Sequence, residues 1–274
     1  MQTQRQDAAL EYTSARFPMT IDWTQILAAV WRPRTARLRP VRSIDPIALD
    51  ALVGIDRQKQ ALVANTQRFL AGTPANNALL WGARGTGKSS LIKALLNAYA
   101  DAGLRLIEVP KIDLYNLPEI LDDIRELPQR FIVYCDDFSF EVNDDSYIGL
   151  KTVLDGSIER PPDNVILYAT SNRRHLLPEQ MSDNLASEVI NGEVHYADAI
   201  EEKISLSDRF GLWLSFYQPD QDGFLKIVDS YFPDFVGDRA TLHAAAKRFA
   251  ATRASHSGRT ARQFYNYYCG VEDA

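Results

Sequence analysis

Residues 76–99 read NNALLWGARGTGKSSLIKALLNAY, and this stretch decides the fold. It predicts an apolar strand at 78–81, a glycine-rich turn, and a helix with one apolar face. The turn matches the phosphate-binding loop pattern G-x-x-x-x-G-K-[ST], with the residues Gly82, Ala83, Arg84, Gly85, Thr86, Gly87, Lys88 and Ser89. Glycines let backbone N–H groups point inward at a phosphate, and the following helix adds its free N-terminal N–H groups. Lys88 is expected to reach the β- and γ-phosphates and Ser89 to hold Mg²⁺, so the stretch predicts a nucleoside triphosphate site.

The bulk composition is that of an ordinary globular protein. The chain has 274 residues, of which 46% are hydrophobic and 24% charged. No run of 18 apolar residues occurs, and the start MQTQRQDAAL has no apolar signal core. We therefore expect neither a membrane span nor secretion, and a cytoplasmic location.

Cysteine and histidine usage points away from structural metals and disulfides. The two cysteines, Cys135 and Cys269, give no disulfide framework, and the four histidines lack ligand spacing. A net charge of −6 argues against a globally basic nucleic-acid binder.

The rest of the chain alternates strands and helices. Apolar runs predict strands at 78–81, 104–109, 131–135, 165–169 and 212–217, with helices at 57–70, 117–126 and 148–154 among the connections. Such strands favour a parallel sheet covered on both faces, with the carboxyl ends of the strands on one rim. The phosphate loop, the pair Asp136-Asp137 and Asn172 all follow strand ends, so we expect them to meet at that rim.

Three units are expected along the chain: an N-terminal extension at 1–44, an α/β core at 45–218 and a helical lid at 219–274. The lid would contain helices at 223–232, 239–252 and 259–268, and the extension a short helix at 20–31. An arginine-rich strap without acids follows that helix, and Pro33 and Pro40 predict that it is extended. Its basic residues are Arg32, Arg34, Arg37, Arg39 and Arg42. The strap either lies solvated across the protein's own acidic surface or contacts nucleic acid, an acidic partner or another subunit.

The acids after the third strand are candidates for metal binding and catalysis. Asp136 is placed to support Mg²⁺, and Asp137 to orient or deprotonate the attacking water. Asp137 stands where many related NTPases have Glu, and its shorter side chain leaves Glu141 as a second candidate base.

Four further polar residues are candidates for sensing the phosphates. Asn172 can hold the water or the γ-phosphate without adding charge, or it forms a simple turn. Arg209 either stabilises transition-state charge in a neighbouring subunit or pairs locally with an acid such as Asp208. Arg259 and Arg262 open the last helix, where either can reach the phosphates or remain a surface charge.

These elements, in this order, resemble the AAA+ ATPases. The runs ALLWGARGTGKSSL, YCDDFSFE, LKTVLDGS, YATSNRRHL and EKISLSDRFGLWL are similar to a bacterial AAA+ family catalogued as domain of unknown function 815, over residues 46–270. The resemblance implies a P-loop NTPase (AAA+) fold with a parallel five-stranded sheet of order 5-1-4-3-2 and a small C-terminal helical lid. The run KIDLYNL at 111–117 lacks the aromatic–hydrophobic–Gly signature of protein-threading pores, which weakens an unfoldase interpretation.

The resemblance also implies roles for individual residues. It places Walker A at 82–89, with Ser90 beside the nucleotide, and Walker B at Asp136 and Asp137. It makes Asn172 sensor 1, Arg209 the arginine finger and Arg262 sensor 2. The adenine would meet the backbone of Val53, Gly54 and Ile55. The Asp–Asp pair departs from the usual Asp–Glu and puts the hydrolysis rate in question.

The sequence thus predicts an ATP- and Mg²⁺-dependent AAA+ ATPase that remodels or loads an unknown macromolecular client. It would form a homo-oligomer with Arg209 acting in trans and take a protein client, with no membrane partner. The alternative is an ATP-binding switch or scaffold with negligible hydrolysis. A DNA-associated loader that uses the arginine strap ranks below both, so nucleic acid is a possible but not a favoured partner.

Overall fold

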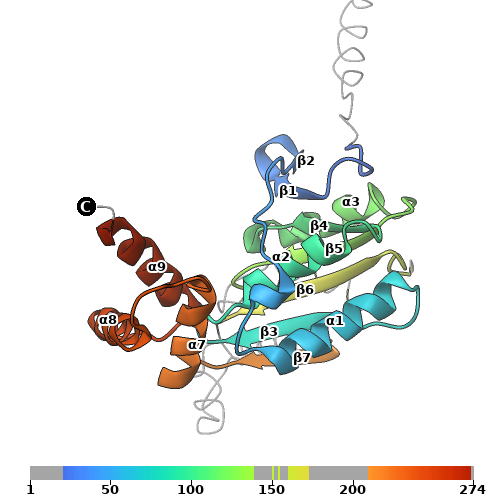
Figure 1. Cartoon of the computed structure of the whole chain (residues 1–274). Coiled ribbons are helices and arrows are strands. Elements are labelled where there is room, and N and C mark those ends of the chain that lie inside the picture. The colour runs from blue at the N-terminus through green and yellow to red at the C-terminus, as the bar shows by residue number, and fades with distance from the viewer. Residues whose placement is uncertain (1–20, 139–149, 151–153, 155–159, 173–208, 273–274) are drawn as a thin grey trace, which may run out of the picture.

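A seven-stranded sheet forms the centre of the structure (Figure 1), a computed structural model that describes residues 21–138, 150, 154, 160–172 and 209–272. Its strands are β1 (Ala28–Arg32), β2 (Arg37–Pro40), β3 (Ala78–Gly82), β4 (Leu104–Glu108), β5 (Arg130–Cys135), β6 (Val165–Ser171) and β7 (Leu212–Phe216). Their order across the sheet is β2-β1-β4-β5-β6-β3-β7. All neighbours pair in parallel except β1 and β2, which form an antiparallel hairpin.

The prediction of a five-stranded, all-parallel sheet is wrong. The five expected strands do follow one another as β7-β3-β6-β5-β4, but two unexpected strands extend the sheet beyond β4. The helix expected at 20–31 is also wrong, because Ala28–Arg32 is strand β1. The pairing with β4 decides this, since the Leu106 N–H donates to the Leu27 carbonyl at 3.0 Å and Trp31 is buried. Tertiary pairing thus overrides a local pattern that fits a helix equally well.

The strap is not extended throughout. Pro33–Thr35 forms a 3₁₀ turn, and Ala36 has a φ of 45°, so the chain reverses and returns as β2. A boundary between extension and core at residue 44 would therefore separate β1 and β2 from the sheet that they belong to.

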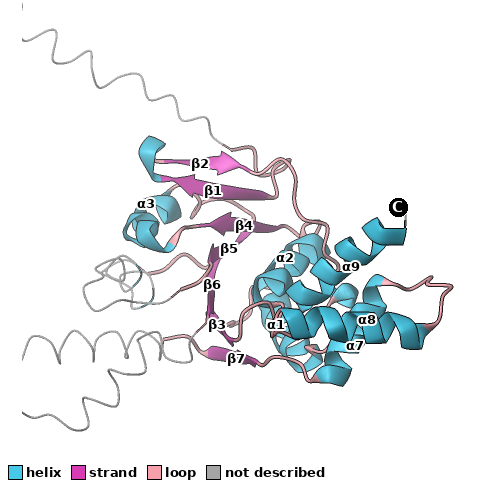
Figure 2. Ribbon diagram, turned by 90° about the vertical axis from the view of Figure 1, so that its left-hand side faces the viewer, coloured by secondary structure: helices cyan, strands magenta, loops and turns pink. Residues whose placement is uncertain are grey.

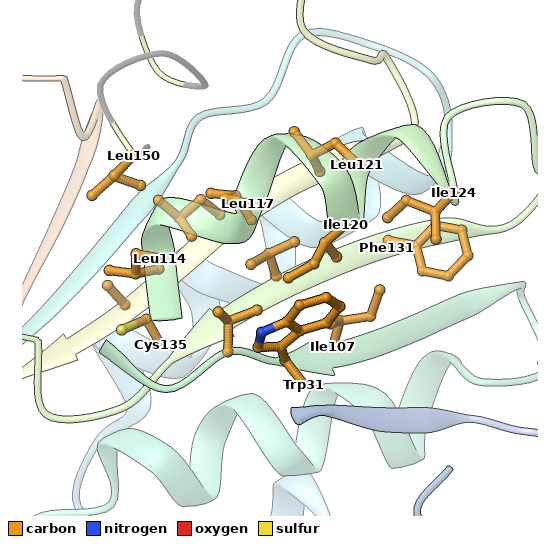
Figure 3. Close-up of a cluster of buried hydrophobic side chains, with 14 of the residues drawn as sticks. Trp31, Ile107, Leu114, Leu117, Ile120, Leu121, Ile124, Phe131, Cys135 and Leu150 are labelled. Atoms are coloured by element: carbon orange, nitrogen blue, oxygen red, sulfur yellow. The ribbon is translucent and has the colours of Figure 1, made fainter. Parts of the chain in front are cut away.

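Helices cover both faces of the sheet (Figure 2). One face is covered by α1 (Asp56–Leu70) and α2 (Lys88–Tyr99), and η5 (Leu49–Ala51) contacts α2. The other face carries η6 (Lys111–Asn116) and α3 (Leu117–Asp122). Figure 3 shows the buried cluster under α3, where Trp31 lies with side chains of α3 and of β4 and β5. Of the helix expected at 148–154, only Leu150 and Leu154 are described, and both are helical.

A buried polar network ties α1 to the sheet at the start of β3, the end of that strand opposite the phosphate loop. Asn65 Nδ2 donates to the Tyr168 hydroxyl at 3.1 Å and to the Asn76 carbonyl at 2.8 Å. The Thr66 hydroxyl lies 2.9 Å from the same Tyr168 oxygen. Because Asn76 lies just before β3, this network fixes the start of the strand that carries the loop.

Three C-terminal helices pack around a hydrophobic cluster of their own. They are α7 (Gln221–Tyr231), α8 (Arg239–Thr252) and α9 (Gly258–Glu272), so the three helices expected there are present. Phe232 packs against the rings of Phe264, Tyr265 and Tyr268 in this cluster. The Asp220 and Asp238 side chains cap the N-termini of α7 and α8. That these helices form a separate lid remains a proposal.

Within the described part of the chain, no helix is both long and apolar enough to cross a bilayer.

Candidate functional site

The glycine-rich turn between β3 and α2 has the backbone of a phosphate loop. Gly82, Gly85 and Gly87 have φ values of 131°, 75° and 98°, which glycine adopts without strain. A Cβ at Gly82 would lie 1.9 Å from the Phe216 carbonyl oxygen of β7, so a side chain cannot fit there. The helix α2 begins directly after the turn, at Lys88, and its first N–H groups therefore face the loop.

Lys88 lies inside this loop. Its side chain is 7% exposed, and Nζ donates to the carbonyls of Gly82 and Ala83, both at 2.7 Å, and to Asn172 Oδ1 at 3.3 Å. Burial lowers the pKa of the Lys88 ammonium, and the nearby charges of Asp136 and Asp137 oppose this change. A partly desolvated cation surrounded by main-chain dipoles is well suited to bind phosphate oxygens.

Asp136 follows the last residue of β5 and meets the first turn of α2. Its Oδ1 accepts hydrogen bonds from the Ser89 hydroxyl at 2.9 Å and from the Thr170 hydroxyl of β6 at 2.5 Å. Partial burial acts to raise the pKa of Asp136. The hydroxyls of Thr170, Tyr134 and Ser89 outweigh that effect, so the pKa lies below its ordinary value. The carboxylate is therefore ionised at neutral pH beside a serine hydroxyl, an arrangement of hard oxygen ligands.

Asp137 is held in an unusual backbone conformation at the same rim. Its φ of 52° is left-handed, a region that aspartate tolerates better than most residues. Its N–H donates to the Thr170 hydroxyl at 3.1 Å, and its carboxylate accepts from Asn172 Nδ2 at 2.5 Å. Asn172 thus bridges Lys88, through its oxygen, and Asp137, through its nitrogen. A neutral amide links the loop's cation to the second acid.

The start of α9 lies against the phosphate loop. A Cβ at Gly85 would lie 2.8 Å from the Ser257 hydroxyl and 3.2 Å from the Arg259 Cβ, and one at Gly258 would lie 3.3 Å from the Gly85 carbonyl. The Arg259 charge contributes to lowering the pKa of Lys88. The Arg262 charge acts instead on Tyr231 of α7. Of the two arginines expected at this helix start, Arg259 is the one that the described contacts bring to the loop.

The remaining predicted residues are related to this group less directly. The Ile55 side chain approaches the loop, with its Cδ1 3.4 Å from a Cβ built on Gly87, and Gly54 has a φ of 80°. Arg209 precedes β7, the strand beside β3, and its role as a finger remains a prediction. The reserve base Glu141 lies outside the described residues.

Three residues near the site are not among those that the sequence predicts. Thr170 contacts both acids, and its hydroxyl directly after the apolar run 165–169 is a signal that could have identified it. Tyr134 is 3% exposed, and its hydroxyl has no hydrogen-bond partner among the described atoms, although it lies close enough to affect the pKa of Asp136. Ser257 contacts the loop although the two are far apart in the sequence, and no local sequence pattern predicts such a contact.

The chemistry of these residues fits a Mg²⁺–nucleoside triphosphate. The loop offers inward backbone curvature and a buried ammonium, and Ser89 with Asp136 offers two oxygen ligands 2.9 Å apart. Among the described residues there is no group of three or more His, Cys, Asp or Glu side chains that would hold a metal alone. Mg²⁺ commonly keeps waters and phosphate oxygens among its ligands, so two protein oxygens are sufficient.

The fold and the glycine-rich turn together define an α/β protein with a P-loop-like architecture. A family model described as "Protein of unknown function (DUF815)" matches residues 24–272, and the chain belongs to that family. Among curated proteins, none matches the sequence.

Solved structures with a similar fold include the Thermotoga maritima RuvB Holliday junction branch migration motor. The identity is 14% and the TM-score 0.46, over 81% of this chain and 72% of that chain. A variant of the same RuvB gives 13% identity and a TM-score of 0.48, over 82% and 73% of the two chains.

Proposed function

We propose that this protein is a Mg²⁺-dependent ATPase of the AAA+ type that couples nucleotide hydrolysis to the assembly or remodelling of a macromolecular client. The observation that carries the proposal is the convergence of Lys88, Ser89 and Asp136 at one end of the sheet. Residues 48 positions apart in sequence, from Lys88 to Asp136, come together there as phosphate and metal chemistry requires.

Each residue of the site is proposed to have its own role in binding ATP or in its hydrolysis. The loop 82–89 and Lys88 bind and orient the phosphates, with Ser90 beside them, and the backbone around Val53, Gly54 and Ile55 holds the adenine. Ser89 and Asp136 hold Mg²⁺, which when bound neutralises charge on the phosphate oxygens. Asp137 orients the attacking water and accepts its proton at a carboxylate oxygen.

Asn172 is proposed to register the state of the phosphates. Its oxygen accepts from Lys88 and its nitrogen donates to Asp137, so a change at either partner alters the other. Its amide positions the water or the γ-phosphate without adding negative charge. Arg259, with Arg262 as the second candidate, supplies positive charge from the lid.

The protein is further proposed to act as a homo-oligomer in which Arg209 serves the nucleotide of the neighbouring subunit. Arg209→Ala should then lose turnover while it keeps its ATP affinity, because the arginine acts only on charge that develops in the transition state. Lys247→Ala, which removes an exposed cation of α8, is the control. An equal loss of affinity and turnover, or no loss of either, would exclude the trans-acting finger.

One observation favours a second function, an ATP-binding switch with negligible hydrolysis. The Asp137 carboxylate is held at 2.5 Å by Asn172, and its side chain is one methylene shorter than the usual glutamate. Steady-state phosphate release from the pure protein separates the two functions. The ATPase proposal expects release that Lys88→Ala and Asp137→Asn both abolish, and the switch expects wild-type release no higher than that of Lys88→Ala.

The client is proposed to be a protein, acted on in the cytoplasm. An Asp137→Asn variant should retain bound ATP, since asparagine keeps the geometry and tolerates the left-handed backbone. Partners that co-purify with this variant, and not with Lys88→Ala, would identify the client.

A further inference from the structure

The arginines of the hairpin β1–β2 form an exposed basic surface that the nucleotide site does not use. We define this basic hairpin face as Arg32, Arg37 and Arg39, which lie on one side of the hairpin, with Arg34 and Arg42 flanking it in sequence. All five arginines are exposed. The hairpin lies at the edge of the sheet, because β2 is its terminal strand in the described structure (Figure 1).

The strand register fixes which side these side chains occupy. Arg32 is directly opposite Arg37, and Val30 is directly opposite Arg39. Paired residues of an antiparallel ladder project to the same face, so the three arginines share the face of Val30. Trp31 and its partner Leu38 project to the opposite face, where both pack in the hydrophobic cluster below α3. The apolar side of the hairpin is thus committed to the core, and the basic side is left to solvent.

This arrangement opposes folding stability. Two like charges directly opposite each other in a ladder have Cβ atoms about 4.5–5.5 Å apart and repel. In the described structure no carboxylate lies within 4.0 Å of any of the five guanidiniums. Arg39 has only a long contact of 3.5 Å, to the carbonyl of Pro40 next to it. No direct ion pair with a described carboxylate therefore neutralises the strap, and its exposed guanidiniums are available to an external anion.

The backbone of β2 decides what kind of anion fits. The Val41 N–H donates to the Ala28 carbonyl at 2.8 Å, so by alternation the main-chain groups of Arg37 and Arg39 also face β1. The outward-facing positions of β2 are Leu38 and Pro40, and a proline has no N–H. An added peptide strand would find a single outward N–H along β2, which is how proteins blunt an edge against strand addition. Recognition must therefore come from the guanidiniums.

We propose that the basic hairpin face binds the phosphodiester backbone of a nucleic acid, independently of base sequence. Guanidinium groups bind phosphate oxygens bidentately, and Arg37 and Arg39 are two residues apart on a strand, a separation of about 6.6 Å. A polymer that repeats an anionic group at about this spacing can contact both arginines, whereas an isolated carboxylate can contact only one of them. The inference does not depend on ATP hydrolysis and stands if the proposed ATPase activity fails.

Fluorescence anisotropy of a labelled single-stranded oligonucleotide of mixed sequence, titrated with the full chain at several salt concentrations, tests this proposal. Three phosphate contacts predict that log Kobs falls with log salt with a slope of about −2. Arg37→Gln/Arg39→Gln should reduce the magnitude of that slope by about 1.4 and weaken binding equally for different base sequences. The control Lys247→Gln/Arg248→Gln removes two exposed positive charges from α8 and should leave the slope unchanged.

Two further readouts separate phosphate binding from a structural role of these arginines and from recognition of an acidic protein. The free energy of unfolding of Arg37→Gln/Arg39→Gln should equal or exceed that of the wild type, because a like-charge pair is relieved. A marked loss of stability would mean that these arginines are structural and would overturn the proposal. Binding of polyglutamate in place of the oligonucleotide would indicate an acidic protein partner and would also overturn the proposal. An equal loss of oligonucleotide binding in the control variant would overturn it as well.

Discussion

The contact between the phosphate loop and α9 can be tested by adding a single methyl group. Gly85→Ala places a Cβ 2.8 Å from the Ser257 hydroxyl and 3.0 Å from the Ser257 Cβ, at a backbone φ of 75°. Gly103→Ala is a matched control, since Gly103 has a φ of 90° and no atom within 4 Å of an added Cβ. The two substitutions share the backbone strain and differ in the contact.

The expected magnitudes follow from these two contributions. An alanine in the left-handed backbone region lowers the free energy of unfolding by about 1–2 kcal/mol, and this loss applies to both variants. Forcing extra volume into a packed contact costs about 1–3 kcal/mol more, which only Gly85→Ala loses. Urea unfolding followed by tryptophan fluorescence should therefore find Gly85→Ala less stable than Gly103→Ala.

A double-mutant cycle with Ser257 assigns this difference in stability to the contact with the start of α9. Ser257 accepts from the Thr260 N–H at 3.2 Å as the cap of α9, and replacing a serine cap by glycine costs only a few tenths of a kcal/mol. Ser257→Gly removes the atoms that clash, so the double variant should recover most of the excess loss. Equal losses for Gly85→Ala and Gly103→Ala, or a coupling energy of zero in the cycle, would refute the contact between the phosphate loop and the start of α9.

Three other substitutions test a buried network under α1, the carboxylate of Asp136 and the cap of α8. Tyr168→Phe leaves the buried amide of Asn65 without one of its acceptors, so the free energy of unfolding should fall by about 1–3 kcal/mol; an unchanged urea midpoint would show that the network contributes nothing. The pKa of Asp136 is lowered in the fold, so its stabilising contribution is present above the unfolded value of about 3.9 and is lost as pH falls through the folded pKa. Asp136→Asn should therefore destabilise the protein near pH 7 and differ little from wild type in strong acid, and a pH-independent difference would contradict this. Asp238→Ala removes the cap of α8 and should lower the unfolding free energy by about 1 kcal/mol, whereas Asp234→Ala, which caps no helix, should not.

The part of the site that depends on local pattern could be predicted from the sequence. The loop at 82–89 and the acids at the end of β5 follow from glycines, one lysine and polar residues placed after apolar runs. Parallel pairing then brings strand ends to one rim, which is why Asn172 is expected near Lys88, and the two side chains are 3.3 Å apart.

Features that depend on tertiary contacts could not be predicted in this way. The residues AAVWR of β1 are equally compatible with a helix, and pairing with β4 decides between the two. Arg259 and Arg262 lie within one turn at the start of α9, and only the packing of that helix on Gly85 distinguishes them. The resemblance to AAA+ proteins suggests Arg262, whereas the described contacts favour Arg259.

The proposed function requires that residues 82–89 bind the phosphates of Mg²⁺–ATP opposite Asp136. Isothermal titration calorimetry of the full chain with Mg²⁺–ATP measures this binding, in parallel with Lys88→Ala and with Lys247→Ala as the control. We expect a saturable heat for the wild type and the control, and none for Lys88→Ala. No heat with the wild type, or the same heat with Lys88→Ala, would contradict it.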